Sequence, residues 1–154
     1  MAFKLGFNAK LYRQTSGTRA AWPGTGAAPN LDEVPNVRDL KLSEDTAVAD
    51  VSTRGGGGYT QEVAALKHVG ATWQMVYDPS DADFTAIQTA YRTNAVIALA
   101  ILDGTAATVG TQGMWFDAMI TKFEMTQELT NAIVVDVEVV NAYSAVAPAW
   151  VTTA

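Results

Sequence analysis

Four consecutive glycines, Gly55, Gly56, Gly57 and Gly58, place the strongest constraint on how this chain folds. Glycine loses more conformational freedom on folding than any other residue, so four in a row destabilise the interior of a helix or strand. Residues 47–53 before them and 59–69 after them are rich in residues that favour strands. This arrangement predicts a long β-hairpin with a mobile glycine tip, in which residues 44–60 form an extended hairpin loop.

Alternation of apolar and polar residues predicts further strands along the chain. Together with the hairpin, the expected strands cover residues 37–42, 47–53, 59–69, 71–77, 95–102, 114–125 and 132–143. Residues 95–102 are apolar at every position, which is typical of a central strand or of one covered by a helix. The pattern predicts a mainly β fold, a β-sandwich or barrel.

One α-helix is expected at about residues 80–93, packed on the sheet. Ser80 and Asp83 have the spacing of an acidic capping box, which marks a helix start. Asn94 is expected to end the helix. The apolar residues of one helix face follow the spacing i, i+3 and i+7, and they are Phe84, Ile87 and Tyr91.

The length of 154 residues fits a single domain, residues 1–154, with too little chain for two full cores. Residues 13–36, which contain Trp22, are rich in Thr, Gly, Ala, Pro and Asn and are expected to form a loop or arm. Residues 144–154 are expected to form a C-terminal tail.

The absence of cysteine excludes disulfides, thiolate metal sites and a cysteine nucleophile. The first residues lack the apolar region of a secretory signal. The longest apolar run has eight residues, 95–102, which is too short to cross a bilayer. We therefore expect no membrane segment and synthesis in a cytoplasm.

The candidate catalytic groups have simpler explanations. His68 is the only histidine, and at a strand end it is more typical of a surface or interface residue than of a catalyst. Asp136 and Glu138 lie roughly 7 Å apart on one strand face, a spacing that any solvent-facing strand shows as well as an inverting glycosidase. Asp81 and Asp83 are explained by helix capping and the helix dipole.

Ligand-binding motifs are likewise missing from the sequence. The glycine run is not followed by Lys and Ser or Thr, as a phosphate-binding loop would be. The acidic pairs at 32–33 and 44–45 lack the alternating oxygen ligands of a calcium loop. We expect no catalytic residue, no metal and no cofactor, and therefore no enzyme.

The order of these features resembles that of the siphophage major tail (tail tube) proteins, which are related to the tube proteins of contractile tails and type VI secretion. The resemblance covers roughly residues 30–143. It consists of a loop-rich start, the glycine-tipped hairpin, a strand, the helix, a strand, a loop ending in Gly110-Thr-Gln-Gly113 and two final strands. Asp78-Pro-Ser-Asp81 and Gly113-Met-Trp-Phe-Asp-Ala-Met-Ile-Thr121 also look like that family.

The resemblance implies a structural subunit of a phage tail that forms stacked hexameric rings around a hollow channel for DNA passage into the host. It implies a place in the virion tail, with synthesis in the bacterial host cytoplasm. The implied partners are other copies of the chain, a tape measure protein, a tail terminator and baseplate or tip proteins. The implied inter-ring loop consists of Asp50, Ser52, Thr53, Arg54, Gly55, Gly56, Gly57, Gly58 and Tyr59.

The charge of the chain fits a channel that DNA passes through without specific binding. The net charge is -6, and Lys and Arg are scattered singly. An acidic channel wall repels phosphate, whereas a basic wall would hold DNA through counterion release. We therefore expect Asp136 and Glu138, with Asp117 or Glu124, to face the channel, the alternative being that they face external solvent.

Two other interpretations stay open at this point. One is a tail-terminator or capsid-decoration protein of related fold. The other is a monomeric β-barrel that binds a small apolar ligand, with the apolar strands at 95–102 and 132–140 lining its cavity.

Overall fold

The computed structural model describes residues 3–15 and 31–153. These residues form one eight-stranded antiparallel sheet, one α-helix and two short 3₁₀ helices. The elements are η1 (Gly6–Asn8), β1 (Lys10–Gln14), β2 (Leu31–Glu33), β3 (Val37–Asp50), η2 (Arg54–Gly56), β4 (Glu62–Val76), α1 (Ala82–Thr93), β5 (Val96–Leu102), β6 (Gln112–Thr126), β7 (Val134–Asn141) and β8 (Ala149–Thr152). The predicted mainly β fold with one packed helix is confirmed.

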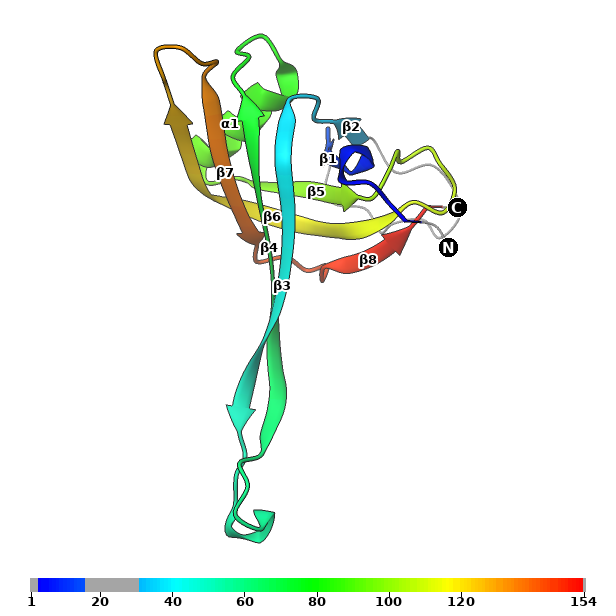
Figure 1. The fold of residues 1–154 in the computed structure, drawn as a ribbon, viewed down its shortest axis with the longest axis vertical. Helices are drawn as coiled ribbons and strands as arrows, with labels where there is room; N and C mark the ends of the chain where they lie inside the picture. The colour runs from blue at the N-terminus through cyan, green and yellow to red at the C-terminus, as the bar shows by residue number, and fades with distance from the viewer. Residues whose placement is uncertain (1–2, 16–30, 154) are drawn as a thin grey trace.

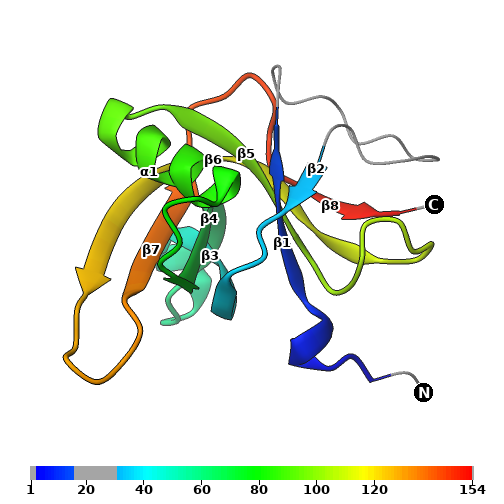
Figure 2. The ribbon, with the colours of Figure 1, turned by 90° about the horizontal axis from the view of Figure 1, so that it is seen from above.

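The sheet is continuous because β6 takes part in both of its halves. The strand order is β2-β1-β5-β6-β7-β4-β3, and β8 pairs with β6 outside this path. A β-bulge between Ile120 and Lys122 interrupts the β6–β7 register, and bulges bend strands. β6 accordingly curves as it passes from β5 and β8 to β7 (Figure 2). The expected sandwich or barrel is thus built from one curved sheet.

Two core clusters lie on opposite faces of the sheet at β5 and the first half of β6. The larger core cluster lies under α1 and includes Trp73, Phe84, Phe116 and Val137. The smaller cluster lies on the other side, around Trp115. β5 supplies alternate residues to the two clusters, Leu99 and Ile101 to the first and Ala98, Ala100 and Leu102 to the second. The expected central position is confirmed, because β5 pairs with β1 on one side and β6 on the other.

The helix begins one residue later than the capping box predicts. Asp81 is the N-cap, and its carboxylate accepts hydrogen bonds from the backbone N–H groups of Asp83 at 3.4 Å and Phe84 at 3.3 Å. The predicted pairing of Ser80 with Asp83 is wrong, because the Ser80 hydroxyl donates to Asp78 at 2.6 Å. Asn94 ends the helix as expected, with a φ of 56° in the left-handed region.

Asp83 has a different role from the one expected. Instead of serving only the helix dipole, its carboxylate accepts two hydrogen bonds from the Arg13 guanidinium, at 3.0 and 2.8 Å. Both side chains are largely shielded from water, with 13% and 11% of their surfaces exposed. This ion pair ties α1 to β1 across 70 residues of sequence. Neither Arg13 nor the strand β1 is recognisable as important from sequence alone.

The hairpin strands are longer than predicted. Residues 37–42 and 47–53 were expected as two strands, yet β3 runs without a break from Val37 to Asp50. The strands expected at 59–69 and 71–77 likewise form one strand, β4 (Glu62–Val76). Gly70 does not divide β4, because it pairs with Ser43 on one side and Val140 on the other. Cross-strand pairing overrides the weak local preference of one glycine.

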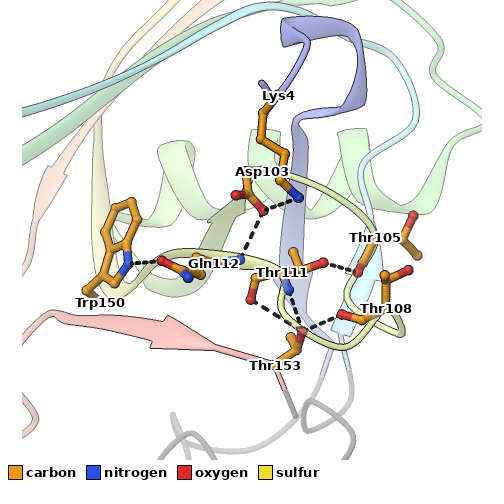
Figure 3. A network of polar contacts seen from close by, with 8 residues as sticks. All are labelled: Lys4, Asp103, Thr105, Thr108, Thr111, Gln112, Trp150 and Thr153. Atoms are coloured by element: carbon orange, nitrogen blue, oxygen red, sulfur yellow. Dashed lines mark hydrogen bonds and ion pairs between the residues drawn. The ribbon is translucent and has the colours of Figure 1, made fainter. Parts of the chain in front are cut away.

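Two peripheral segments also differ from expectation. Residues 144–154, predicted as a tail, contain β8, and Thr153 anchors this end of the chain (Figure 3). The Thr153 hydroxyl accepts from the backbone N–H of Thr111 at 3.0 Å and donates to the Thr108 carbonyl. Residues 13–36, predicted as a loop or arm, begin in β1 and contain β2 near their end, and their middle, including Trp22, lies outside the described residues.

We predict that Arg13→Met lowers the free energy of unfolding by about 3 kcal/mol, because it leaves the Asp83 carboxylate buried without its partner. Chemical denaturation measures the change. The double variant Arg13→Met with Asp83→Leu should recover much of the loss, since it removes both charges. Equal stability of the single variant and the wild type would contradict the structural role of the pair.

Candidate assembly surfaces

The β3–β4 hairpin extends well beyond the rest of the sheet (Figure 1). Pairing of β4 with β7 ends at Gly70, opposite Val140, whereas β3 and β4 continue to pair as far as Asp50 and Glu62. We call residues 43–70 of this hairpin the arm, and from here on the word refers only to them. An isolated two-stranded ribbon is only marginally stable in water, so the arm depends on its continuity with the packed half of the hairpin.

The arm ends in a defined turn. The Asp50 carboxylate accepts from the Ser52 backbone N–H at 2.8 Å, and the Ser52 hydroxyl accepts from the Gln61 N–H at 2.8 Å. Hydrogen bonds from the Ser52 side chain and then its backbone lower the pKa of Asp50. The carboxylate form therefore supports the turn at neutral pH, and this support is lost as the pH falls through the folded-state pKa.

The nine residues predicted for the inter-ring loop all lie at this tip. Three of them form η2 and the others flank it in sequence. Tyr59 keeps 80% of its surface exposed. Gly57 and Gly58 have φ values of 67° and 87°, in the region that favours glycine. Gly55 and Gly56 lie within the 3₁₀ turn and need no such freedom. Only half of the glycine run is therefore explained by backbone conformation.

Three of the four carboxylates predicted for the channel wall lie together on β6 and β7. Glu138 is paired with Thr72 of β4 and Lys122 of β6, and Asp136 is paired with Gln74 and Glu124. β3 extends the same two rows with Lys41 opposite Thr72 and Arg38 opposite Gln74. These residues form what we call the polar face: Arg38, Lys41, Thr72, Gln74, Lys122, Glu124, Asp136 and Glu138.

The polar face is mixed in charge, because three basic residues stand among its carboxylates. Lys122 lies 3.1 Å from the Glu124 carboxylate. The pKa of Lys122 is raised, first by its hydrogen bond to Glu124 and then by the charges of Glu124, Glu138 and Asp136. Sequence reasoning missed Arg38, Lys41 and Lys122. Strict alternation would put Arg38 and Lys41 on opposite faces of the predicted strand. They share a face only because of the register irregularity between them, which the sequence does not reveal.

Asp117 lies away from these carboxylates. It precedes the β6 bulge, in the half of the strand that pairs with β5, and it is half-buried. Its carboxylate accepts a hydrogen bond from the Ser144 hydroxyl, and its backbone carbonyl accepts from Ala142. By the strand register Asp117 is on the same face of β6 as Lys122 and Glu124, but it lies farther along the strand, beside Ser144 of the chain that follows β7.

His68 lies at the start of the arm, with Nδ1 3.3 Å from the Asp45 carboxylate and 55% of its side chain exposed. This position agrees with the predicted surface or interface histidine. Within residues 3–15 and 31–153, no group of three or more His, Cys, Asp and Glu side chains could hold a metal ion. None of the helices in these ranges has the length and apolar character needed to cross a bilayer.

The strands expected to line a ligand cavity are packed against other side chains. Leu99, Val135 and Val137 are completely buried in the core under α1. A surface groove of about 680 Å³ lies away from these two strands, between η1, β1 and the start of β3. It is lined partly by charged residues, Lys10, Glu33, Arg38 and Asp39 among them. The described structure therefore gives no support to a barrel that encloses an apolar ligand.

Two unpaired strand edges bound the part of the described sheet that is formed by β6, β7, β4 and β3. β3 pairs with β4 on one side, and its other edge has no partner strand along Val37–Asp50. β5 pairs with β6 only as far as Met119, so the same edge of β6 is open over residues 120–126. The strands β6, β7, β4 and β3 thus form a region of sheet that is open at both ends.

Comparison with known proteins shows the fold. No family model matches the sequence, and no curated protein matches it significantly. Solved structures do match. A chain from the virion of a native gene transfer agent particle has a TM-score of 0.69 and 14% identity, and the match covers 99% of this chain and 100% of that one. The SPP1 tail tube protein matches with a TM-score of 0.69 and 13% identity, covering 97% of this chain and 79% of that one.

A chain from the baseplate of the anti-feeding prophage is a more distant match. Its TM-score is 0.57 at 9% identity, with 94% of this chain and 91% of that one covered. The three structures together confirm the predicted tail-tube-like fold. The match extends beyond the residues on which the sequence resemblance was based.

We predict that replacing Gly57 and Gly58 by alanine destabilises the arm tip by about 1–2 kcal/mol per residue, because both positions have positive φ. Hydrogen exchange at the Gln61 amide, which the turn protects, should become faster. Gly55→Ala is the matched control, since the nearest atom to an added Cβ is the Thr53 hydroxyl at 3.7 Å. Equal exchange rates in the wild type, in the variant with alanine at 57 and 58 and in Gly55→Ala would contradict the need for glycine at the two positions of positive φ.

Proposed function

We propose that this chain is a structural, non-enzymatic subunit of a phage tail tube. Copies assemble into rings, and the rings stack into a hollow tube through which DNA passes into the host. The full-length match to the SPP1 tail tube protein and to gene transfer agent chains supports this assignment. In this proposal the protein resides in the tail of the virion.

The pair of open strand edges is the observation that carries the proposal. An open edge presents unpaired N–H and C=O groups that bind another strand readily. The edge of β3 and the edge of β6 lie at opposite ends of one four-stranded region, so β3 of one copy can pair with β6 of the next. Such a head-to-tail contact is heterologous, and it generates a ring when the rotation between copies closes.

We further propose that the ring contains six subunits. The tail of an empty gene transfer agent particle has C6 symmetry, and its chain matches this one with a TM-score of 0.68 over 99% of the length. The arm, which extends away from the ring-forming strands, would contact a neighbouring ring through its tip. A tape measure protein, a tail terminator and baseplate or tip proteins are the further partners of this proposal.

The polar face is our candidate for the channel wall. It belongs to the strands that would form the ring, and it lies on the side of the sheet opposite the core under α1. Asp136, Glu138 and Glu124 would repel DNA phosphates, while Lys122 offsets part of this charge. A wall with alternating charges neither binds the DNA backbone strongly nor excludes it from the channel. Asp117 is not included in this wall.

We predict that deleting residues 55–58 leaves a folded monomer that no longer forms tubes. The deletion shortens the arm tip, whereas the core lies in the other half of the hairpin. Circular dichroism tests the fold, and negative-stain electron microscopy tests assembly. Tubes of normal length from the deletion variant would disprove the role of the tip. Wild-type protein that forms only isolated rings would favour the tail-terminator or capsid-decoration alternative.

We predict that Asp136→Lys with Glu138→Lys leaves tubes intact but impairs DNA delivery, because a basic wall holds phosphate. Infectivity of particles that carry the variant measures the effect. Asp32→Lys with Glu128→Lys is the control, since it changes the net charge equally at exposed positions away from the polar face. Unchanged infectivity of the first variant would remove these carboxylates from the channel wall.

A further inference from the structure

The two faces of the β3–β4 hairpin exchange their character as the hairpin leaves the body. In the body, Leu42 and Ala71 are cross-strand partners that pack into the core under α1. Their neighbours Lys41 and Thr72 are also partners, and they lie on the opposite, polar face. Because strand residues alternate between faces, each face can be followed outward along β3 into the arm.

A second register irregularity, between Thr46 and Val48, does not disturb this alternation on β3. Thr46 pairs with Lys67 and Val48 with Ala64, so β4 supplies the extra residue. Two residues of β4, Ala65 and Leu66, therefore stand opposite Ala47, as in a β-bulge.

The face that continues the core side becomes charged in the arm. It carries Glu44, Asp50, Glu62 and Lys67. Val69, at the base, still packs into the core, and Val48 is the exposed large apolar residue on this face. In the body this side is buried against α1 and the other strands, whereas the same side of the arm is suited to water.

The opposite face carries Ser43 and the Asp45–His68 pair at the base of the arm, and it becomes apolar beyond them. This outer part consists of Ala47, Ala49, Val51, Val63, Ala65 and Leu66, which we call the apolar arm face. Its larger side chains are open to solvent, with exposed fractions of 49% for Val51, 51% for Val63 and 84% for Leu66. No charged or polar side chain interrupts this group of six.

The body of the same chain does not cover the apolar arm face. Pairing with β7 ends at Gly70, and beyond that point the arm projects away from the remaining strands (Figure 1). A contiguous exposed apolar surface on a protein marks a contact with another molecule.

We propose that the apolar arm face is buried against a second copy of this chain, while the charged arm face remains in water. This inference rests on the proposed tube assembly and adds to it which side of the arm makes the contact. In the body, the hairpin buries the face that packs into the core under α1. In the arm, the opposite face is apolar, because that is the face that packs against the second copy.

A second copy is the expected occupant for two reasons. The arm is the direct continuation of β3, whose open edge meets a second copy in the proposed ring. The chain also exposes a further apolar segment that a homopolymer can use as a complementary surface. This segment contains Phe3, Leu5 and Phe7, which are 83%, 67% and 95% exposed.

Two neighbouring alanines provide a matched test of the faces. Ala49 pairs with Val63 on the apolar arm face, and Ala64 pairs with Val48 on the charged one. Both alanines are exposed, so either accepts glutamate in the free subunit. We expect A49E to raise the protein concentration needed for assembly at least about tenfold, because it buries a charge in the contact. We expect A64E to assemble like the wild type, as measured by sedimentation.

Thiol labelling tests the same assignment without disrupting the contact. The chain contains no cysteine, so A49C and A64C each carry a single reactive thiol. On assembly, maleimide labelling of the A49C variant should slow at least about tenfold, the same factor that we expect for the concentration effect of A49E. Labelling of the A64C variant should change little.

The outcomes separate this inference from the proposed function. If the wild type assembles and A49E assembles equally well, or if A64C rather than A49C is protected, the assignment of the apolar arm face is wrong and the tube proposal stands. If the wild type remains monomeric at high concentration, the tube proposal fails, and the second copy fails with it as the partner.

Discussion

Backbone pairing between β3 and β4 is the interaction on which the rest of the molecule depends. It runs from Val37, opposite Met75, to Asp50, opposite Glu62. One half of this ladder is held by the core and by β7, whereas the other half has only its own hydrogen bonds. A ribbon of two strands gains little stability by itself, so the packed half sets the direction and register of the arm. The arm can therefore remain ordered while exposing an apolar face.

The same strands connect the arm to the proposed channel wall. β3 and β4 carry Arg38, Lys41, Thr72 and Gln74 in rows with the carboxylates of β6 and β7. Strand pairing places Lys122 of β6 opposite Glu138 of β7, and alternation along β6 puts Lys122 and Glu124 side by side on the same face. In the proposed tube, one set of strands would close the ring, present charge to the channel and extend the arm to the next copy.

Much of the fold could be predicted from local sequence patterns, because alternation and helical spacing reflect burial directly. The strands at β5 and β7, the helix face with Phe84 and Ile87, and the helix end at Asn94 follow from such patterns. The missed features are non-local. The pairing of Arg13 with Asp83 joins residues far apart in sequence, and Gly70 stays within β4 only because strands pair with it on both sides.

For the candidate site, the sequence by itself determined a projecting hairpin with a glycine tip and acidic residues grouped on one strand face. Hydrophobic periodicity and backbone freedom are properties of short segments, so they can be read without partners. Only the tertiary structure decided that Lys122 joins Asp136 and Glu138, that Asp117 does not, and that the arm inverts its apolar face. The physical reason is register: bulges in β3, β4 and β6 set which residues share a face, and only cross-strand pairing determines where they occur.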